Sequence, residues 1–525
     1  MRKYATADCE TDPFLHGRIP KPFLWGFYDP VNNDGFSYFR TTEDFIEFIK
    51  EYEGIIYFHN GGKFDMHFLL NAIDPQENIM IINGRIAKLK IGKAELRDSF
   101  LLLPVPLSAY KKDEIDYNKF EADIREKHIN EICKYMEGDC VYLYEILSKQ
   151  FEDYEQKLTL ATSAFDFWHN NFNKTKYKPK SGRFFFEQFK PYYYGGRVEC
   201  FKKGIIKENF EVFDINSAYP YAMTFNHPYG NEYIILNKIP EKNLELCFCD
   251  IQAVAKGCFP FRDKNKKLQF PNDNISRNYK ITGWELKTAL EANAVKITRI
   301  NRIYKFLNTI TFKDYAEHFF KLKAELKGKD EAKYLLSKLY LNSLYGKFGQ
   351  SSLEHREYSL CERKYIEGYI EAGFEYEGEL GNFALMSKII DESKMKFYNV
   401  ATAASITGFV RAYLFKHIIN SEKPIYCDTD SLACQGFNGD IGKELGQWDK
   451  EGDFSEGAIG GKKLYAFKYD VKEQQKYKIS SKGAKLNYKE IFAIAKGEEI
   501  IYKNIAPTFS ITKKPDFVVR KIKLT

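Results

Sequence analysis

The segment IYCDTDSLA, residues 425–433, places two carboxylates inside an apolar run. If the segment is a β-strand, Asp428 and Asp430 are two residues apart and point to the same face of a sheet. Like charges on one face repel unless a cation lies between or opposite them. The segment therefore predicts a charged site on a sheet, and the alternative is a turn that carries two solvated aspartates.

A second apolar strand ends in a carboxylate, at Asp214 in EVFDINSAYP. If the two strands are neighbours in one sheet, Asp214, Asp428 and Asp430 surround one point. Buried carboxylates this close are tolerated when divalent cations lie among them. Magnesium prefers carboxylates together with substrate phosphates, so the pattern predicts a metal pair that acts on a triphosphate.

The segment KLYLNSLYGKFG, residues 338–349, supplies the complementary charge. Lys338, Asn342 and Tyr345 are spaced to share one face of a helix. This face suits a nucleotide, with the lysine on phosphate and the tyrosine on base or sugar. The alternative is a core helix whose lysine reaches out to solvent.

DINSAYP, KLYLNSLYG and YCDTDS, in this order, resemble motifs A, B and C of the family B DNA polymerases, with Ala218 where leucine is usual. The resemblance implies two Mg²⁺ ions per active site, for which Mn²⁺ can substitute. By position, Asp214, Ile215 and Asp430 resemble the metal ligands and Asp428 a supporting carboxylate. The residues that resemble the nucleotide site are Tyr219, Lys323 (or Lys327), Lys338, Asn342 and Tyr345.

The N-terminal third contains a second set of carboxylates. Asp8 and Glu10 alternate on an expected strand, Asp65 follows in HNGGKFD, and Tyr135 and Asp139 are one helical turn apart in YMEGD. Together they resemble the three motifs of the family's ribonuclease-H-like 3′–5′ exonuclease. The resemblance implies a second two-metal site in which Tyr135 orients the attacking water.

The same resemblance implies contacts to DNA. Those expected along a frayed single strand are Thr11, Tyr57, His59, Asn60, Phe64, Phe68, Ser99 (followed by Phe100 where leucine is usual), Lys112 and Tyr117. YYGG, KLY and TGFVR resemble family motifs that contact template or primer, although Val410 occupies a small-residue position. The residues carried over from them are Tyr193, Gly195, Gly196, Lys463, Tyr465, Thr407 and Arg411.

The expected fold is α/β and α+β multidomain, with the exonuclease domain followed by a right-hand polymerase domain. Extra chain between the motifs matches the two insertions of the protein-primed branch, which implies a terminal-protein primer and processive strand displacement. The expected ranges are 1–165 for the exonuclease and 166–525 for the polymerase, with palm about 190–260 and 390–450, first insertion 226–312, fingers 313–349, second insertion 350–395 and thumb 460–525.

The composition of the chain limits the classes of partner that it is expected to bind. A net charge of +7 permits a nucleic-acid partner, and the ten cysteines form no CxxC pair that would indicate a zinc site. We find no apolar signal core and no run long enough to span a bilayer. We therefore expect a cytoplasmic monomer (in the host if phage-encoded) that binds primer–template DNA, single-stranded DNA, dNTPs and a terminal protein, without a membrane.

Two alternatives stay open. The chain could instead be a family B polymerase that extends only RNA or DNA primers, and the sequence itself contains no terminal-protein domain. A non-catalytic DNA-binding descendant of a polymerase would lack a metal ligand, and all seven expected carboxylates are present.

Overall fold

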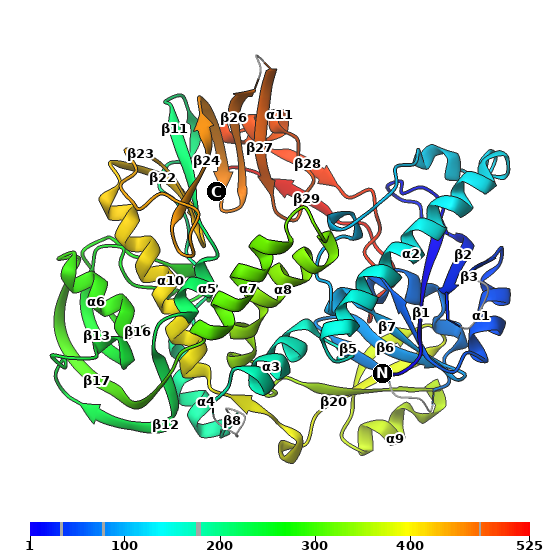
Figure 1. Cartoon of the computed structure of the whole chain (residues 1–525), viewed down its shortest axis with the longest axis horizontal. Helices are drawn as coiled ribbons and strands as arrows, with labels where there is room; N and C mark the ends of the chain where they lie inside the picture. Colours follow the sequence, from blue (N-terminus) through cyan, green and yellow to red (C-terminus); the bar gives the residue numbers. More distant parts are fainter. Residues whose placement is uncertain (32–34, 76–78, 175–179, 472–473) are drawn as a thin grey trace.

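The structure is a computed structural model that describes residues 1–31, 35–75, 79–174, 180–471 and 474–525 (Figure 1). The N-terminal domain is built on a seven-stranded sheet of order β3-β2-β1-β4-β7-β6-β5. Alternating and apolar runs of β-branched and aromatic residues form its inner strands, in which β1 and β4 are parallel and bury both faces. Its elements are β1 (Tyr4–Thr11), β2 (Pro22–Asp29), β3 (Gly35–Phe39), α1 (Thr42–Lys50), β4 (Ile55–Phe58), β5 (Met80–Ile82), β6 (Arg85–Ile91), β7 (Ala94–Asp98) and α2 (Ile129–Asp153).

Two helices of this domain differ from the sequence-based expectation. The sequence of residues 54–73 predicts a strand, a glycine-containing turn and one helix, but after β4 the chain forms three short 3₁₀ turns, at Gly61–Lys63, Asp65–Phe68 and Leu70–Ala72. It runs against β6 so closely that a Cβ on Gly62 would lie 2.0 Å from the Ile86 carbonyl oxygen. The pattern of residues 121–158 predicts a helix, but α2 begins only at Ile129, because residues 121–128 form turns.

The central sheet has five antiparallel strands in the order β24-β11-β23-β22-β9. The sequence of residues 399–419 predicts an amphipathic helix, but the helix found there, α10, is buried on nearly every side. It packs against α5, α6, α8 and β12, so it has no solvent face to make polar. The bounds are β9 (Val198–Cys200), β11 (Phe210–Ile215), α5 (Ala218–Met223), α10 (Val400–Asn420), β22 (Lys423–Asp428), β23 (Ser431–Gln435) and β24 (Trp448–Phe454).

The first insertion is a four-stranded antiparallel sheet of order β12-β17-β13-β16, more regular than the short segments expected there. Helix α6 begins at a capping box made by Thr282 and Glu285 and packs on this sheet and on α10. The bounds are β12 (His227–Leu236), β13 (Cys247–Ala255), β14 (Phe261–Arg262), β15 (Leu268–Gln269), β16 (Ser276–Thr282), α6 (Gly283–Glu291) and β17 (Val295–Ile310).

Helices α7 (Lys313–Leu326) and α8 (Glu331–Phe348) form the pair expected between residues 313 and 349, separated at Gly328. Helix α3 (Leu160–Asn171) packs on α8, so the expected domain boundary at residue 165 falls inside a helix of the second unit. The short elements nearby are β8 (Lys180–Ser181), α4 (Arg183–Phe189) and β21 (Phe397–Tyr398).

The second insertion contains a three-stranded sheet, not a single hairpin, with β18 (Arg356–Cys361), α9 (Ile366–Glu371), β19 (Glu375–Leu380) and β20 (Phe383–Ile389). Leu360, Leu380 and Leu385 share a hydrophobic core with the N-terminal domain. The insertion therefore packs against that domain, below it in Figure 1.

The C-terminal unit contains a four-stranded sheet of order β10-β25-β26-β27 and one helix. After β28 the chain returns to the N-terminal domain, where the Phe509 ring packs against Phe64 and Phe68 at centroid distances of 5.3 and 5.4 Å. The bounds are β10 (Gly204–Ile206), β25 (Glu456–Gly461), β26 (Leu464–Val471), β27 (Gln474–Ser481), α11 (Tyr488–Ala495), β28 (Ile500–Lys503) and β29 (Val519–Ile522).

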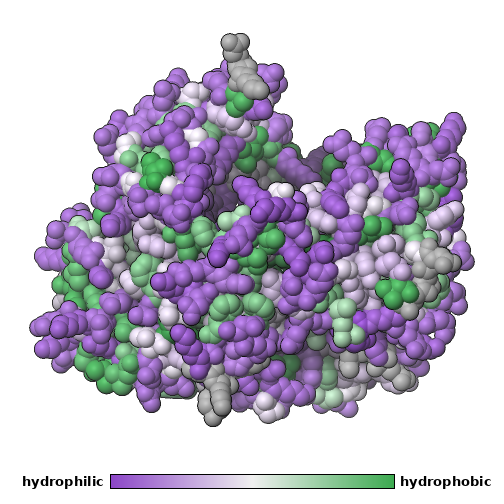
Figure 2. All heavy atoms as spheres, viewed as in Figure 1, coloured by the Kyte–Doolittle hydropathy of each residue, from purple (hydrophilic) through white to green (hydrophobic). Residues whose placement is uncertain are grey.

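A hollow lies between these two units. Figure 2 shows it at the top of the view, between the C-terminal unit and the N-terminal domain, with mainly hydrophilic residues around it. Within the described residues, no helix is long and apolar enough to cross a membrane.

Candidate active sites

The aspartates of YCDTDS lie on a hairpin turn and not on one strand face. Asp428 ends β22, β23 begins at Ser431, and Thr429 between them has a left-handed φ of 64°. The expectation that both side chains share the face of a strand is therefore wrong. The turn is fixed from outside, because the Thr429 main-chain N–H donates to the Arg197 carbonyl oxygen at 2.6 Å.

Asp214 and Asp430 are brought together by the sheet. Strand β11 pairs with β23, and the Ile215 main-chain N–H donates to the Asp430 carbonyl oxygen at 2.8 Å. Burial, then the charge of Asp430, raises the pKa of Asp214 to about 7. Burial likewise raises the pKa of Asp430 to about 6. Two carboxyls whose charges are disfavoured in this way suit a divalent cation between them.

The Asp428 carboxylate faces a lysine side chain. Lys463, in the turn between β25 and β26, donates to both carboxylate oxygens of Asp428 at 2.6 Å. The expected cluster of three carboxylates around one point is therefore reduced to Asp214 and Asp430, with Asp428 paired beside them. Tyr465 lies next to this pair, its ring 5.0 Å from that of Tyr426.

The expected nucleotide residues lie on α5, α7 and α8, and Tyr219 and Tyr345 are within reach of the Asp430 charge. The Tyr219 and Tyr345 rings stack in parallel with centroids 4.4 Å apart. The Lys323 ammonium is 3.5 Å from the Ser217 hydroxyl, and burial followed by the charges of Lys338 and Lys327 lowers its pKa. No ion pair joins these three lysines to a carboxylate among the described residues, so their positive charges are left uncompensated there. On the same helix, the Asn342 amide donates to the Lys338 carbonyl oxygen.

The N-terminal carboxylates converge more tightly. Asp8, Glu10 and Asp139 each offer one carboxylate oxygen, and these atoms lie within 4.8 Å of one another. Asp65 lies beside them and accepts from the Cys9 main-chain N–H at 3.3 Å. Burial is the first cause of the raised pKa of all four carboxyls, and that of Asp65 is about 6.

Glu10 Oε1 and Asp139 Oδ1 are buried without a hydrogen-bond partner in the described part of the chain. Unpaired buried oxygens are costly, and they are the donor atoms that a hard divalent cation requires. The residues present therefore fit a divalent metal.

Lys112 and two tyrosines complete this N-terminal site. The Lys112 ammonium donates to Asp139 at 2.9 Å, and the hydroxyls of Tyr117 and Tyr135 are 2.9 Å apart. A cavity opens next to them, lined by residues that include Asp8, Asp139 and Lys112, together with His59, Asn60, Phe100 and Leu107.

The expected single-strand contacts divide into two groups. His59 and Asn60 line the cavity, and Phe64 and Phe68 are half-buried beneath Phe509. Tyr57 is only 1% exposed, in a core shared with α2 and α8, so direct contact with DNA does not fit its position. Ser99 is also fully buried, where its hydroxyl is hydrogen-bonded to His59 and donates to the Phe58 carbonyl oxygen.

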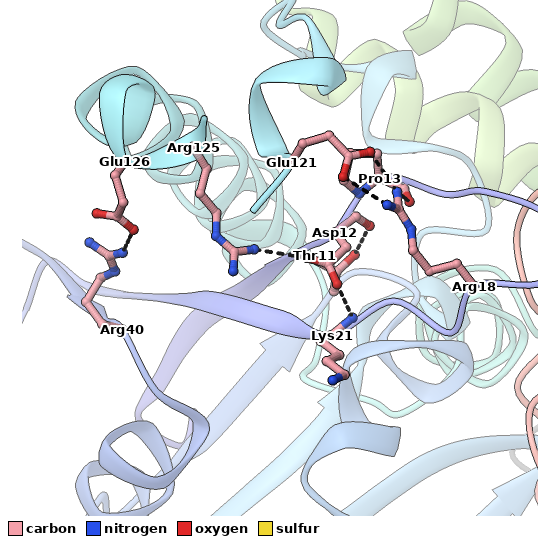
Figure 3. Close-up of polar contacts among 9 residues, drawn as sticks. All are labelled: Thr11, Asp12, Pro13, Arg18, Lys21, Arg40, Glu121, Arg125 and Glu126. Atoms are coloured by element: carbon pink, nitrogen blue, oxygen red, sulfur yellow. Dashed lines mark hydrogen bonds and ion pairs between the residues drawn. The ribbon is translucent and has the colours of Figure 1, made fainter. Parts of the chain in front are cut away.

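Thr11 ends β1 and is nearly buried, and its hydroxyl donates to the Asp12 carbonyl oxygen. Figure 3 shows how the loop that follows is held against residues 121–126. Arg125 donates to Asp12 at 2.9 Å, and Arg18 makes two hydrogen bonds to Glu121. These ion pairs fix the edge of the N-terminal site next to Glu10.

The expected template residues of TGFVR are buried in α10. Thr407 is 3% exposed and donates to the Ala404 carbonyl oxygen, and Arg411 is 2% exposed. The expectation that these side chains contact template directly does not fit this burial. Arg411 instead donates to the Tyr194 and Gly195 carbonyl oxygens, in the YYGG segment. In that segment, Tyr193 packs against Gly349 and Gly196 lies against Thr429.

Two residues near Asp214 and Asp430 were not identified from sequence. Glu451 on β24 contributes to the raised pKa of both Asp214 and Asp430. It comes twenty residues after the end of YCDTDS, and no local pattern marks it. Ser217, in contrast, lies within DINSAYP, and its left-handed φ of 53° turns the chain after Asp214.

Residues 106–440 match the family model described as DNA polymerase type B, organellar and viral. The chain is 35% identical to the DNA-directed DNA polymerase of Enterobacteria phage PRD1, over 100% of this chain and 98% of that protein. It is 24% identical to the DNA polymerase of Bacillus phage phi29, over 90% and 88% of the two chains.

The fold is similar to that of solved phi29 DNA polymerase structures. The structure complexed with single-stranded DNA gives a TM-score of 0.77 at 18% identity, with both chains fully covered. The ternary complex with primer–template DNA and incoming nucleotide gives 0.76 at 18% identity, again with full coverage. The expected α/β and α+β multidomain fold is confirmed.

Proposed function

The chain belongs to the type B DNA polymerases of organelles and viruses and is a DNA-directed DNA polymerase, and on this basis we propose that it also proofreads, with two divalent cations at each of two active sites. Asp214 and Asp430 carry the polymerase half of this proposal. They come from strands that are paired in one sheet, and burial raises the pKa of both carboxyls, a cost to their charged forms that bound cations would offset.

At the polymerase site, Asp214, Asp430 and the main chain at Ile215 would hold the cations. When bound, these supply positive charge to the triphosphate and activate the attacking hydroxyl. Lys323 and Lys338 bind the phosphates, because their charges lack acidic partners in the described structure. The stacked Tyr219 and Tyr345 form a flat surface for the sugar and base.

At the N-terminal site, Asp8, Glu10, Asp65 and Asp139 would hold a second pair, of Mg²⁺ or Mn²⁺. Tyr135 orients the attacking water for 3′–5′ cleavage. A 3′ end would enter through the cavity beside His59 and Asn60, with Phe64 and Phe68 available to stack on bases.

The proposal also includes protein priming. It is supported by the two insertions, each of which has its own sheet, and by the phage relatives that match nearly the full chain. We propose that a terminal protein supplies the priming hydroxyl and that synthesis displaces the opposite strand in the cytoplasm. A polymerase that extends only RNA or DNA primers is the second candidate.

Two variants test the assignment of the sites. Asp430→Ala should abolish primer extension with Mg²⁺ and retain degradation of single-stranded DNA, and Asp139→Ala should do the reverse. Normal extension by Asp430→Ala would refute the polymerase assignment, and normal degradation by Asp139→Ala would refute the exonuclease assignment.

The wild-type chain tests displacement and priming. On a primed single-stranded circle without helper proteins, we expect products longer than one circle. Incubation with dNTP, Mg²⁺ and a candidate terminal protein should label that protein. Extension of DNA primers without such labelling by any candidate would favour the second candidate function.

A further inference from the structure

A buried ion pair joins the first insertion to helix α10. The Arg411 Nε, on α10, donates to Glu285 Oε1, on α6, at 2.7 Å. Their side chains are only 2% and 1% exposed. Burying two charges lowers the free energy of unfolding. Removing one partner lowers it further, because the other is then an uncompensated buried charge. Neither residue belongs to a metal or nucleotide site described above.

The carboxylate of Glu285 is held in one orientation. Its Oε2 accepts from both the main-chain N–H and the hydroxyl of Thr282, each at 2.9 Å, at the start of α6. Helix α10 approaches this cap through Gly408, where a Cβ would lie 2.2 Å from the Thr282 hydroxyl oxygen. The position of Arg411 is therefore set by the fold of the insertion.

Arg411 also forms hydrogen bonds with the main chain of the YYGG segment and so helps to position that segment. Its Nη1 donates to the carbonyl oxygens of Tyr194 at 2.7 Å and Gly195 at 3.0 Å. Nη2 is buried without a partner in the described residues, so Glu285 and these two carbonyls determine where the guanidinium lies.

The YYGG segment in turn supports the turn between the two aspartates. A Cβ on Gly196 would lie 2.8 Å from the Thr429 side chain, and the Arg197 carbonyl accepts from the Thr429 N–H at 2.6 Å. Thr429 separates Asp428 from Asp430 and has a left-handed φ, which costs a β-branched residue energy and needs such support.

We propose that Glu285 and Arg411 are a positioning pair through which the first insertion sets the geometry of the turn that carries Asp430. The inference rests on the proposed polymerase site. Both side chains are buried, and neither is among the residues proposed to hold the metal ions or the triphosphate. The pair acts through main-chain carbonyls, and a loss of alignment at Asp430 would lower the rate of the chemical step more than the affinity for dNTP.

The test compares Glu285→Gln with Glu95→Gln. Glutamine keeps the shape of Glu285 and an oxygen for the Thr282 cap but removes the charge that orients Arg411. We expect kcat for primer extension to fall about 10- to 100-fold while KM for dNTP stays within about twofold. Degradation of single-stranded DNA should not change, because the N-terminal site is built from other elements.

Glu95→Gln is the matched control. Glu95 is also a buried glutamate paired with arginines, Arg2 and Arg97, but it lies in the N-terminal sheet. It should lower stability to urea without changing kcat for extension. If the two variants lose extension equally, or if Glu285→Gln loses both activities in proportion to folded protein, the pair is only structural and the inference is overturned.

A double variant tests whether Glu285 and Arg411 act as one coupled pair or contribute independently to the rate of extension. Arg411→Lys keeps the charge but cannot reach Glu285 and two carbonyls with the same planar geometry. Glu285→Gln/Arg411→Lys should extend no more slowly than the worse single variant, and multiplicative losses would overturn the inference. Failure of the wild-type chain to extend any primer would instead refute the proposed function.

Discussion

Replacing Asp214 with asparagine tests the polymerase metal site by its effect on stability. Burial and Asp430 raise the pKa of Asp214 from 3.8 to about 7 in the folded protein. Without metal, the folded state therefore holds a proton on Asp214 more tightly than the unfolded chain. This contribution to stability is fully present below pH 4 and is lost as the pH rises through 7.

The size of the effect follows from the same pKa. Each tenfold change in proton affinity corresponds to about 1.4 kcal/mol, so the ionised carboxylate costs about 4 kcal/mol at pH 8 at most. Asp214 is only partly buried, and solvent screening lowers this to about 2 kcal/mol. In EDTA at pH 8, Asp214→Asn should be more stable to urea than the wild type by that amount, and the difference should shrink toward pH 4.5.

Mg²⁺ should reverse the order. It binds the folded wild type and raises its stability, but Asp214→Asn lacks a ligand and should respond little. The control is Asp453→Asn on β24, where the side chain is 75% exposed and removal of the charge should change little. If Asp214→Asn is no more stable than the wild type in EDTA at pH 8, or if Mg²⁺ stabilises both equally, the metal assignment is refuted.

Three further predictions concern other parts of the chain. Burial lowers the pKa of His227 to about 4, so stability should fall by about 3 kcal/mol as the pH drops from 6.5 to 4, and His227→Gln should flatten this slope in urea titrations. Phe509→Ala removes the ring that packs on Phe64 and Phe68; it should cost about 3 kcal/mol and slow degradation of single-stranded DNA more than extension, and equal slowing would count against it. Lys338→Met should raise KM for dNTP about tenfold in steady-state extension, and an unchanged KM would exclude a phosphate contact.

Much of the local structure could be predicted from the sequence. The strand that carries Asp8 and Glu10, the strand that ends near Asp214 and the two helices interrupted at Gly328 form where the alternation, periodicity and glycine indicated. These features depend on short-range backbone preferences, which a single segment contains in full. The errors were in segments governed by long-range packing, such as the 3₁₀ turns after β4 and the fully buried α10.

The candidate sites show the same division. The motifs supplied the carboxylates, lysines and tyrosines, and the structure brings most of them together in two places. Five expected DNA contacts, namely Thr11, Tyr57, Ser99, Thr407 and Arg411, are buried instead. A motif specifies which side chain is present, but burial depends on which distant elements pack over it, and one sequence does not contain that information locally.

The sequence by itself determined the identity, order and spacing of the groups that carry chemistry, and with them the family. The tertiary structure decided which of those groups act together. In the folded chain Asp428 pairs with Lys463, and Asp214 and Asp430 lie together at one site. Arg411 forms an ion pair with Glu285, which is more than a hundred residues away in the sequence. The reason is physical, because charges interact through distance and dielectric environment, and both are set by packing between segments far apart in the chain.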